Sequence, residues 1–121
     1  MKKLIALILT TLLVLSCMTA CASGKTLADV QDAGKLTIAT SPDFPPFEYL
    51  AEDGSVVGIE IDILNLVCNQ LGVELDIQQM DFDSVLPGVQ TGKYDLGASG
   101  ISVDPEREEN TLFTVPYCLA A

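Results

Sequence analysis

The sequence contains no histidine and no tryptophan, and only six of its 121 residues are lysine or arginine. Without histidine, imidazole cannot act as a general base or as a zinc ligand. The seventeen acidic residues bring the net charge to −11, which repels nucleic-acid phosphates and anionic lipid headgroups. We therefore expect no nucleic-acid partner, no metal and no other cofactor.

Cysteine is scarce, and the four cysteines at positions 17, 21, 68 and 118 form no CxxC pair. Metal binding by cysteine alone is therefore not indicated. Cys68 falls on an apolar helical stripe, which predicts a buried structural thiol. Cys118 lies near the end of the chain, and a bond between it and Cys68 in an oxidising compartment stays open.

Residues 1–20 have the layout of a secretory signal peptide. Lys2 and Lys3 precede an apolar run that spans 4–15 and is interrupted only by two threonines. This run is too short to cross a bilayer, which needs about 20 apolar residues. The segment carries two of the six basic residues and none of the seventeen acidic ones, so the net charge without it is −13.

Two cysteines follow small residues near the end of this segment, as in the lipobox of bacterial lipoproteins. Cys21, which follows Thr19 and Ala20, is the expected lipidation site, and Cys17 is the alternative. An ordinary signal-peptidase site beside a chance cysteine is the other interpretation. We expect residues 21–33 to form a lipid-anchored tether, because Ala22, Ser23 and Gly24 are small and flexible.

Hydrophobic periodicity predicts alternating strands and helices in the rest of the chain. The expected strands span 35–40, 73–78 and 94–99, the arms of a short hairpin span 47–50 and 56–57, and helices begin near 61, 82 and 104. Asp83 or Ser84 is expected to cap the second helix, which tolerates Pro87 only in its first turn. This order predicts an α/β fold in which helices flank a mainly parallel sheet.

A group of polar residues lies between the third strand and the third helix. Ser99, Gly100 and Ser102 offer hydroxyl and backbone N–H groups that suit an anion. Arg107 falls near the third position of the helix, where a positive charge opposes the helix dipole. A bidentate grip on a ligand carboxylate would explain it. The alternative is a surface arginine that pairs with Glu106, Glu108 or Glu109.

Two phenylalanines occupy the ends of predicted strands. Phe44 follows the first strand and Phe82 follows the second, so both are expected on the rim that Arg107 shares. Core packing is the commoner role for phenylalanine, and Phe82 also fits the helical stripe. Glu60 and Asp62 are interpreted as charges at a helix start, not as a catalytic carboxylate pair.

Five blocks, in order, resemble those of a known family. They are Thr40-Ser41-Pro42-Asp43-Phe44-Pro45-Pro46-Phe47-Glu48, Gly58-Ile59-Glu60-Ile61-Asp62-Ile63, Met80-Asp81-Phe82-Asp83, Lys93-Tyr94-Asp95-Leu96 and Phe113-Thr114-Val115-Pro116-Tyr117. The chain resembles polar amino-acid-binding proteins of bacterial ABC importers, which are extracellular solute-binding proteins of family 3 with the periplasmic-binding-protein type II fold. The resemblance runs from about residue 34 to residue 117.

The resemblance implies roles for individual residues. Arg107 and Ser102 would bind the α-carboxylate of an amino acid, helped by the backbone around Gly100. Ser99 would lie where family members accept the α-ammonium group. Phe44 and Phe82 would wall the side-chain pocket. Ser41 stands where binders of basic amino acids carry aspartate, which disfavours lysine or arginine as the ligand.

By the same resemblance, residues 34–121 would be a partial first lobe of a solute-binding domain, with the second lobe absent. The protein would be a non-enzymatic, extracytoplasmic lipoprotein that delivers an amino acid to an ABC permease. Contact with the membrane would be through the lipid anchor alone. With one lobe, we expect no tight ligand binding. A cyclohexadienyl-dehydratase-like enzyme and a ligand-sensing receptor domain of the same fold are the alternatives.

Overall fold

The computed structural model describes residues 25–119. The predicted signal peptide and the lipidation site at Cys21 lie outside these residues. Among the residues described, no helix has the length and apolar character needed to cross a bilayer.

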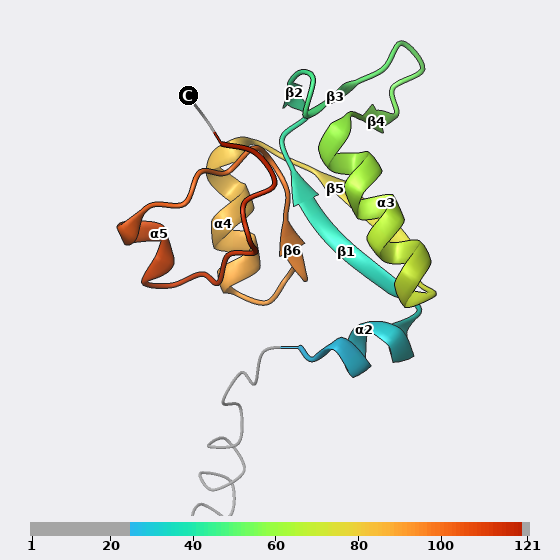
Figure 1. Ribbon diagram of the computed structural model, residues 1–121, viewed down its shortest axis with the longest axis vertical. Helices are drawn as coiled ribbons and strands as arrows, with labels where there is room; N and C mark the ends of the chain where they lie inside the picture. The colour runs from blue at the N-terminus through green and yellow to red at the C-terminus, as the bar shows by residue number, and fades with distance from the viewer. Residues whose placement is uncertain (1–24, 120–121) are drawn as a thin grey trace, which may run out of the picture.

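A three-stranded parallel sheet lies at the centre of the molecule (Figure 1). The central strand β1 (Lys35–Thr40) pairs with β5 (Glu74–Gln79) on one side and with β6 (Leu96–Gly97) on the other. The register places Ile38 beside both Ile77 and Leu96. The predicted parallel sheet is therefore confirmed, although β6 is shorter than the expected strand over 94–99.

A second, antiparallel sheet lies beyond the carboxyl end of β1 (Figure 1). It consists of β2 (Asp43–Phe44), β3 (Glu48–Leu50) and β4 (Val56–Val57), in that order. The predicted hairpin is β3 and β4, and its turn contains Gly54 with a φ of 83°. The pairing of β2 with β3 was not expected. Strand β2 has only two residues, which is too short to show a hydrophobic alternation, and neither residue is β-branched.

Two helices cover opposite faces of the parallel sheet (Figure 1). Helix α3 (Ile59–Leu71) packs on one face, where Ile61 and Leu64 join Ile38 in the hydrophobic core. Helix α4 (Phe82–Gln90) packs on the other, where fully buried Val85 would lie 3.0 Å from a Cβ at Gly97. Strands covered on both faces are typical of parallel sheets.

The ends of the helices agree with the sequence prediction in some places and differ in others. Gly72 ends α3 in the left-handed conformation, as expected. Helix α4 begins at Phe82 with Asp81 as N-cap, so the prediction of Asp83 or Ser84 is wrong and Pro87 lies in the second turn. A helix of nine residues accommodates this proline because the loss is confined to one backbone hydrogen bond near its middle.

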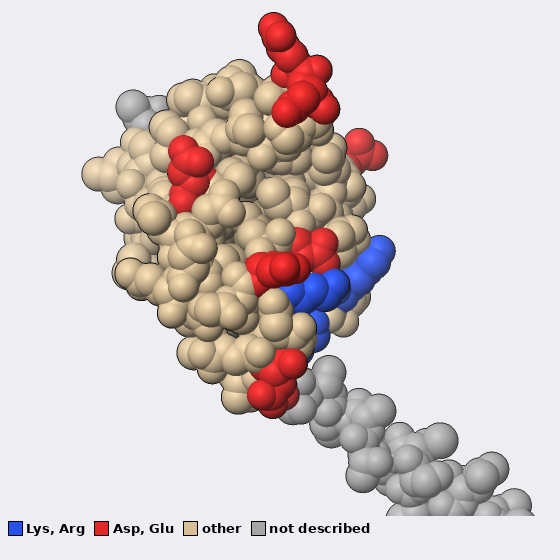
Figure 2. Space-filling view, turned by 90° about the vertical axis from the view of Figure 1, so that its right-hand side faces the viewer, with Lys and Arg blue, Asp and Glu red and all other residues tan. Residues whose placement is uncertain are grey.

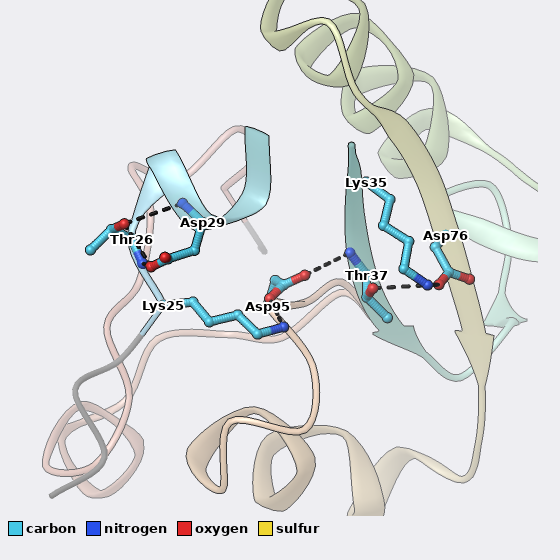
Figure 3. Close-up of polar contacts among 7 residues, drawn as sticks. All are labelled: Lys25, Thr26, Asp29, Lys35, Thr37, Asp76 and Asp95. Atoms are coloured by element: carbon cyan, nitrogen blue, oxygen red, sulfur yellow. Dashed lines mark hydrogen bonds and ion pairs between the residues drawn. The ribbon is translucent and has the colours of Figure 1, made fainter. Parts of the chain in front are cut away.

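Residues 27–33, which we expected to belong to a tether, form helix α2 (Leu27–Ala33). Thr26 and Asp29 make a reciprocal capping box, and Gly34 ends the helix (Figure 3). The expectation failed because this helix is too short for a clear apolar stripe, with Val30 as its only buried residue.

One ion pair holds this segment to the amino-terminal edge of the parallel sheet, and a second links β1 to β5 nearby (Figure 3). Asp95 lies 2.7 Å from the Lys25 ammonium and accepts a 2.8 Å hydrogen bond from the backbone N–H of Thr37. Lys35 pairs with Asp76 at 2.7 Å. On the face of the molecule that Figure 2 shows, the basic side chains gather in one place next to acidic side chains, so their charge is balanced locally.

The cysteines within residues 25–119 are both free thiols. Cys68 is 3 % exposed, which confirms the prediction of a buried thiol, and burial raises its pKa. Cys118 is exposed and is not bonded to Cys68.

Candidate ligand-binding site

The carboxyl ends of β1 and β6 bring Ser41 and Ser99 together. The Ser41 backbone N–H donates to the Ser99 hydroxyl at 3.0 Å, and that hydroxyl donates to the Ser41 carbonyl at 3.3 Å. Both residues are buried, at 6 % and 4 % exposure. Hydrogen bonds between these two predicted site residues therefore link the ends of β1 and β6, and the Ser99 hydroxyl already has hydrogen-bond partners within the protein.

Gly100 turns the chain away from β6 beneath an aromatic ring. Its φ is +56°, and a Cβ at this position would lie 2.8 Å from the ring of Phe44. Both the left-handed backbone and this close approach favour glycine. The Gly100 N–H donates to the Glu60 carboxylate at 3.2 Å, so this amide, which we expected to face the ligand, has a partner inside the protein.

Arg107 is the third residue of helix α5 (Pro105–Glu108), as predicted from the Asp104-Pro105 step. Its Nη1 donates to the Ser102 carbonyl at 2.8 Å, and its Nε lies 3.1 Å from the Asp104 carboxylate. The ion-pair partner is thus the N-cap Asp104, not one of the three glutamates considered from the sequence. These contacts use two of the five guanidinium donors and leave the others for a ligand.

The two rim phenylalanines lie beside the polar groups. Phe82 faces the Arg107 guanidinium, with 6.0 Å between the guanidinium carbon and the ring centroid. Phe44 stacks on Phe47 with 5.4 Å between ring centroids and also contacts the Gly100 turn. Phe44 and Phe82 are 52 % and 40 % exposed, so both rings have surface available to a ligand.

Contacts therefore connect the seven residues named from the sequence in two groups, which the short segment from Gly100 to Ser102 joins along the chain. Ser41 contacts Ser99, Phe44 contacts the Gly100 turn, and Arg107 links Ser102 to Phe82. The arrangement presents a guanidinium beside the ring of Phe82 at the carboxyl edge of a parallel sheet, where ligands of such folds bind. Chemically it suits a molecule with a carboxylate and a side chain that packs on aromatic rings.

The sequence interpretation missed three residues behind the site, namely Glu48, Glu60 and Tyr117. Glu48 is fully buried, and Glu60 is 8 % exposed. The Tyr117 hydroxyl donates to Glu60 at 3.1 Å. Burial, followed by the neighbouring Glu60 carboxyl, raises the pKa of Glu48 to about 8. A glutamate within the apolar Phe47-Glu48-Tyr49 stretch was the available signal, but its partners are far away in the sequence.

A pocket of about 270 Å³ lies at the opposite, amino-terminal edge of the sheet. Lys25, Lys35 and Asp95 are among its lining residues. Its lysines are already paired with Asp95 and Asp76, so their charges are satisfied within the protein. The carboxyl edge differs, because Arg107 there retains guanidinium donors and aromatic surface is exposed.

The fold and the position of the site define a type II periplasmic-binding-protein domain. Residues 36–121 match the family described as bacterial extracellular solute-binding proteins, family 3. The chain belongs to this family, as the sequence blocks predicted.

Several curated proteins are similar to this chain. The arginine-binding protein ArgT of Corynebacterium glutamicum is 43 % identical over 77 residues, which are 64 % of this chain and 25 % of that protein. The arginine-binding extracellular protein ArtP of Bacillus subtilis is 31 % identical over 120 residues, which are 99 % of this chain and 46 % of that protein. A cyclohexadienyl dehydratase of Pseudomonas aeruginosa is 28 % identical over 73 % of this chain and 33 % of its own. The chain thus spans less than half the length of these relatives.

A solved structure supports the same fold. The chain superimposes with a TM-score of 0.75 on the Phe57Trp mutant of domain 1 of TmArgBP in its arginine-bound form, at 35 % identity. The match covers 77 % of this chain and 72 % of that domain.

Proposed function

We propose that this chain provides the amino-acid-binding surface of a solute-binding protein that serves an ABC importer outside the cytoplasm. The observation that carries the proposal is the position of Arg107. Its guanidinium is held by Ser102 and Asp104 and lies over Phe82 at the carboxyl edge of the sheet. A planar fork with unused donors at such an edge suits the α-carboxylate of an amino acid.

Arginine is the ligand that we propose. ArgT and ArtP are named as arginine-binding proteins, and the superimposed domain carries arginine. Ser41 had argued against a basic ligand, but acidic residues are sequence neighbours of both rim phenylalanines: Asp43 precedes Phe44, and Asp81 and Asp83 flank Phe82. Their charge favours the approach of a cationic side chain.

Calorimetric titration of the chain with L-arginine tests this proposal. We expect saturable binding with a Kd in the micromolar to millimolar range, because the rings that would wall the ligand are about half exposed. Agmatine, which is arginine without its carboxylate, is the matched control and should bind at least tenfold more weakly. Absence of saturation with arginine and with the other common amino acids would contradict the proposal, and sub-micromolar binding would contradict the expected affinity.

Lipid anchoring through Cys21 is part of the proposal, and it rests on the signal-like order of charged, apolar and small residues. In a bacterial host, we expect the Cys21→Ala variant to appear in the soluble fraction while the wild-type chain sediments with membranes. Cys17→Ala is the matched control and should leave the protein on membranes. If Cys21→Ala sediments as the wild type does, the anchor assignment is wrong.

The cyclohexadienyl dehydratase among the relatives makes an enzyme the second candidate. Turnover of a cyclohexadienyl substrate by the purified chain would favour it. The arrangement at the rim favours binding, because the carboxyls of Glu48 and Glu60 are buried, at 0 % and 8 % exposure, and so are not presented to a substrate.

A further inference from the structure

The Ser99-Gly100 turn, which is part of the proposed amino-acid site, contacts two acidic side chains. Glu60 accepts the Gly100 N–H at 3.2 Å through its Oε2. The Oε1 of Glu48 would lie 3.5 Å from a Cβ at Gly100. Both carboxyls therefore lie against the same glycine, and both are buried.

Backbone contacts hold the two glutamates near each other. The Glu60 N–H donates to the Phe47 carbonyl at 3.0 Å, directly before Glu48 in the chain. Gly58, at the start of α3, makes this approach sterically feasible, because a Cβ there would overlap the Phe47 carbonyl. The proximity of the two carboxyls is thus built into the junction of β3 and α3.

No positively charged group of the described residues is among those that act on Glu48. The charged groups that act on Glu48 are Glu60 from α3 and Asp43 from β2, and both are acidic. Ser99 from the turn contributes a hydroxyl, and Tyr117 from the carboxyl-terminal segment faces Glu60 with its phenol. Burial and both glutamates raise the pKa of Tyr117, so it stays a neutral donor.

Glu48 itself has no hydrogen-bond partner for either carboxyl oxygen among the described residues. Its side chain is 0 % exposed, so water does not satisfy it at the surface. A buried carboxylate with no cation beside it is strongly unfavourable, whereas a protonated carboxyl is neutral and offers an O–H. The nearby acceptor for that O–H is Glu60.

We propose that Glu48 and Glu60 act as one pair that shares a single proton and positions the Ser99-Gly100 turn of the ligand site. Glu48 carries the proton and donates to Glu60. Glu60 accepts hydrogen bonds from the Gly100 N–H and the Tyr117 hydroxyl and so orients both. Both are positioning residues, and the statement that they position the amino-acid site rests on the proposed function.

The pH dependence of unfolding tests the pair without any ligand. A carboxyl whose pKa is about 8 in the folded state and about 4.5 in the unfolded state binds more protons when folded between these values. Its contribution to stability is therefore complete below about pH 4.5 and is lost as the pH rises toward 8. The equilibrium constant for unfolding should increase up to tenfold per pH unit.

The composition of the chain limits other titrations between pH 5 and pH 7.5. Histidine is the side chain that ordinarily titrates between pH 5 and pH 7.5, and the chain has none. Hydrogen bonds lower the pKa of Asp29, Asp53 and Asp76 below its usual value, so these carboxyls stay ionised throughout the window.

Urea unfolding of four proteins between pH 5 and pH 7.5 gives the comparison. The wild type should lose stability with rising pH. The variant Glu48→Gln should have a flat profile, because its amide donates to Glu60 at every pH. The control is Glu52→Gln, which replaces an exposed glutamate in the β3–β4 turn and should keep the wild-type slope.

The variant Tyr117→Phe should also keep the wild-type slope, with lower stability at every pH. A flat wild-type profile, or a Glu48→Gln variant with the wild-type slope, would overturn the pair.

Carbon-13 NMR of glutamate-labelled wild-type chain provides a second measurement if Glu48→Gln does not fold. One glutamate carboxyl signal should titrate far above the others, and the same signal should move to lower pH in Glu60→Gln. Glutamate signals that all titrate below pH 6 would overturn the proposal.

Arginine titrations at pH 5.5 and pH 7.5 test the positioning role. Wild-type affinity should fall several-fold at the higher pH, and Glu48→Gln should bind equally at both. Equal pH dependence in the two proteins would overturn the positioning role. If arginine binds neither protein, the proposed function fails, whereas the unfolding and NMR measurements still decide the carboxyl pair.

Discussion

Replacing Arg107 with alanine is expected to weaken arginine binding by about two orders of magnitude. A charged hydrogen bond contributes about 1.5–3 kcal/mol, and about 1.4 kcal/mol corresponds to a tenfold change in affinity. The loss should appear in binding and not in folding. The Arg107–Asp104 pair is partly exposed, with side-chain exposures of 30 % and 43 %, and such pairs contribute little to stability.

Two further variants separate the geometry of Arg107 from its charge. Arg107→Lys keeps the charge but loses the planar fork, so we expect an intermediate affinity. Lys93→Ala removes an equal charge from an exposed position over the ring of Tyr94 and should bind as the wild type does. Calorimetry with L-arginine measures all three. An Arg107→Ala variant with wild-type affinity would remove the observation on which the proposed function depends.

Replacing Ile38 with alanine is expected to lower the free energy of unfolding by about 3 kcal/mol. Ile38 is fully buried on the central strand, with Ile77 and Leu96 beside it in the sheet and Ile61 and Leu64 packed in the same core cluster. Truncation of such a side chain loses transfer free energy and leaves a cavity, with typical effects of about 2–5 kcal/mol. This is a large part of the stability of a small domain.

Leu66→Ala is the matched control for Ile38→Ala. Leu66 lies on α3 but is 67 % exposed, so its truncation should change the unfolding free energy by no more than about 0.5 kcal/mol. Urea unfolding monitored by circular dichroism compares both variants with the wild type. If Ile38→Ala is as stable as Leu66→Ala, then Ile38 is not at the centre of the core.

The kinds of element in this chain could be predicted because their signals are local. Alternation at Leu75 and Ile77 predicted a strand with one core-facing side, and the stripe through Ile61, Leu64 and Cys68 predicted a helix. The predictions that failed involved weak local signals. Helix α2 depends on a capping box and on the ion pair of Lys25 with Asp95. The start of α4 was misplaced because Asp81, Asp83 and Ser84 are all residue types that favour the N-cap.

The candidate site could also be predicted only in part. Arg107 could be singled out because a cation at the third position of a helix opposes the helix dipole. Its ion-pair partner could not be identified, since Asp104 competes with three nearby glutamates and the choice depends on side-chain geometry. Glu48 could not be recognised as a site-supporting residue, because burial is a property of the folded chain.

The sequence alone determined the order of strands and helices, the glycine-ended helix α3 and the family to which the chain belongs, since these follow from short-range periodicity and contiguous motifs. Only the tertiary structure decided that Ser41 bonds Ser99 across 58 positions and that Glu60 meets both Gly100 and Tyr117. The physical reason is that such meetings depend on the register of β1 with β6 and on how closely α3 approaches β3. Both are set by packing of the whole domain and not by any short segment.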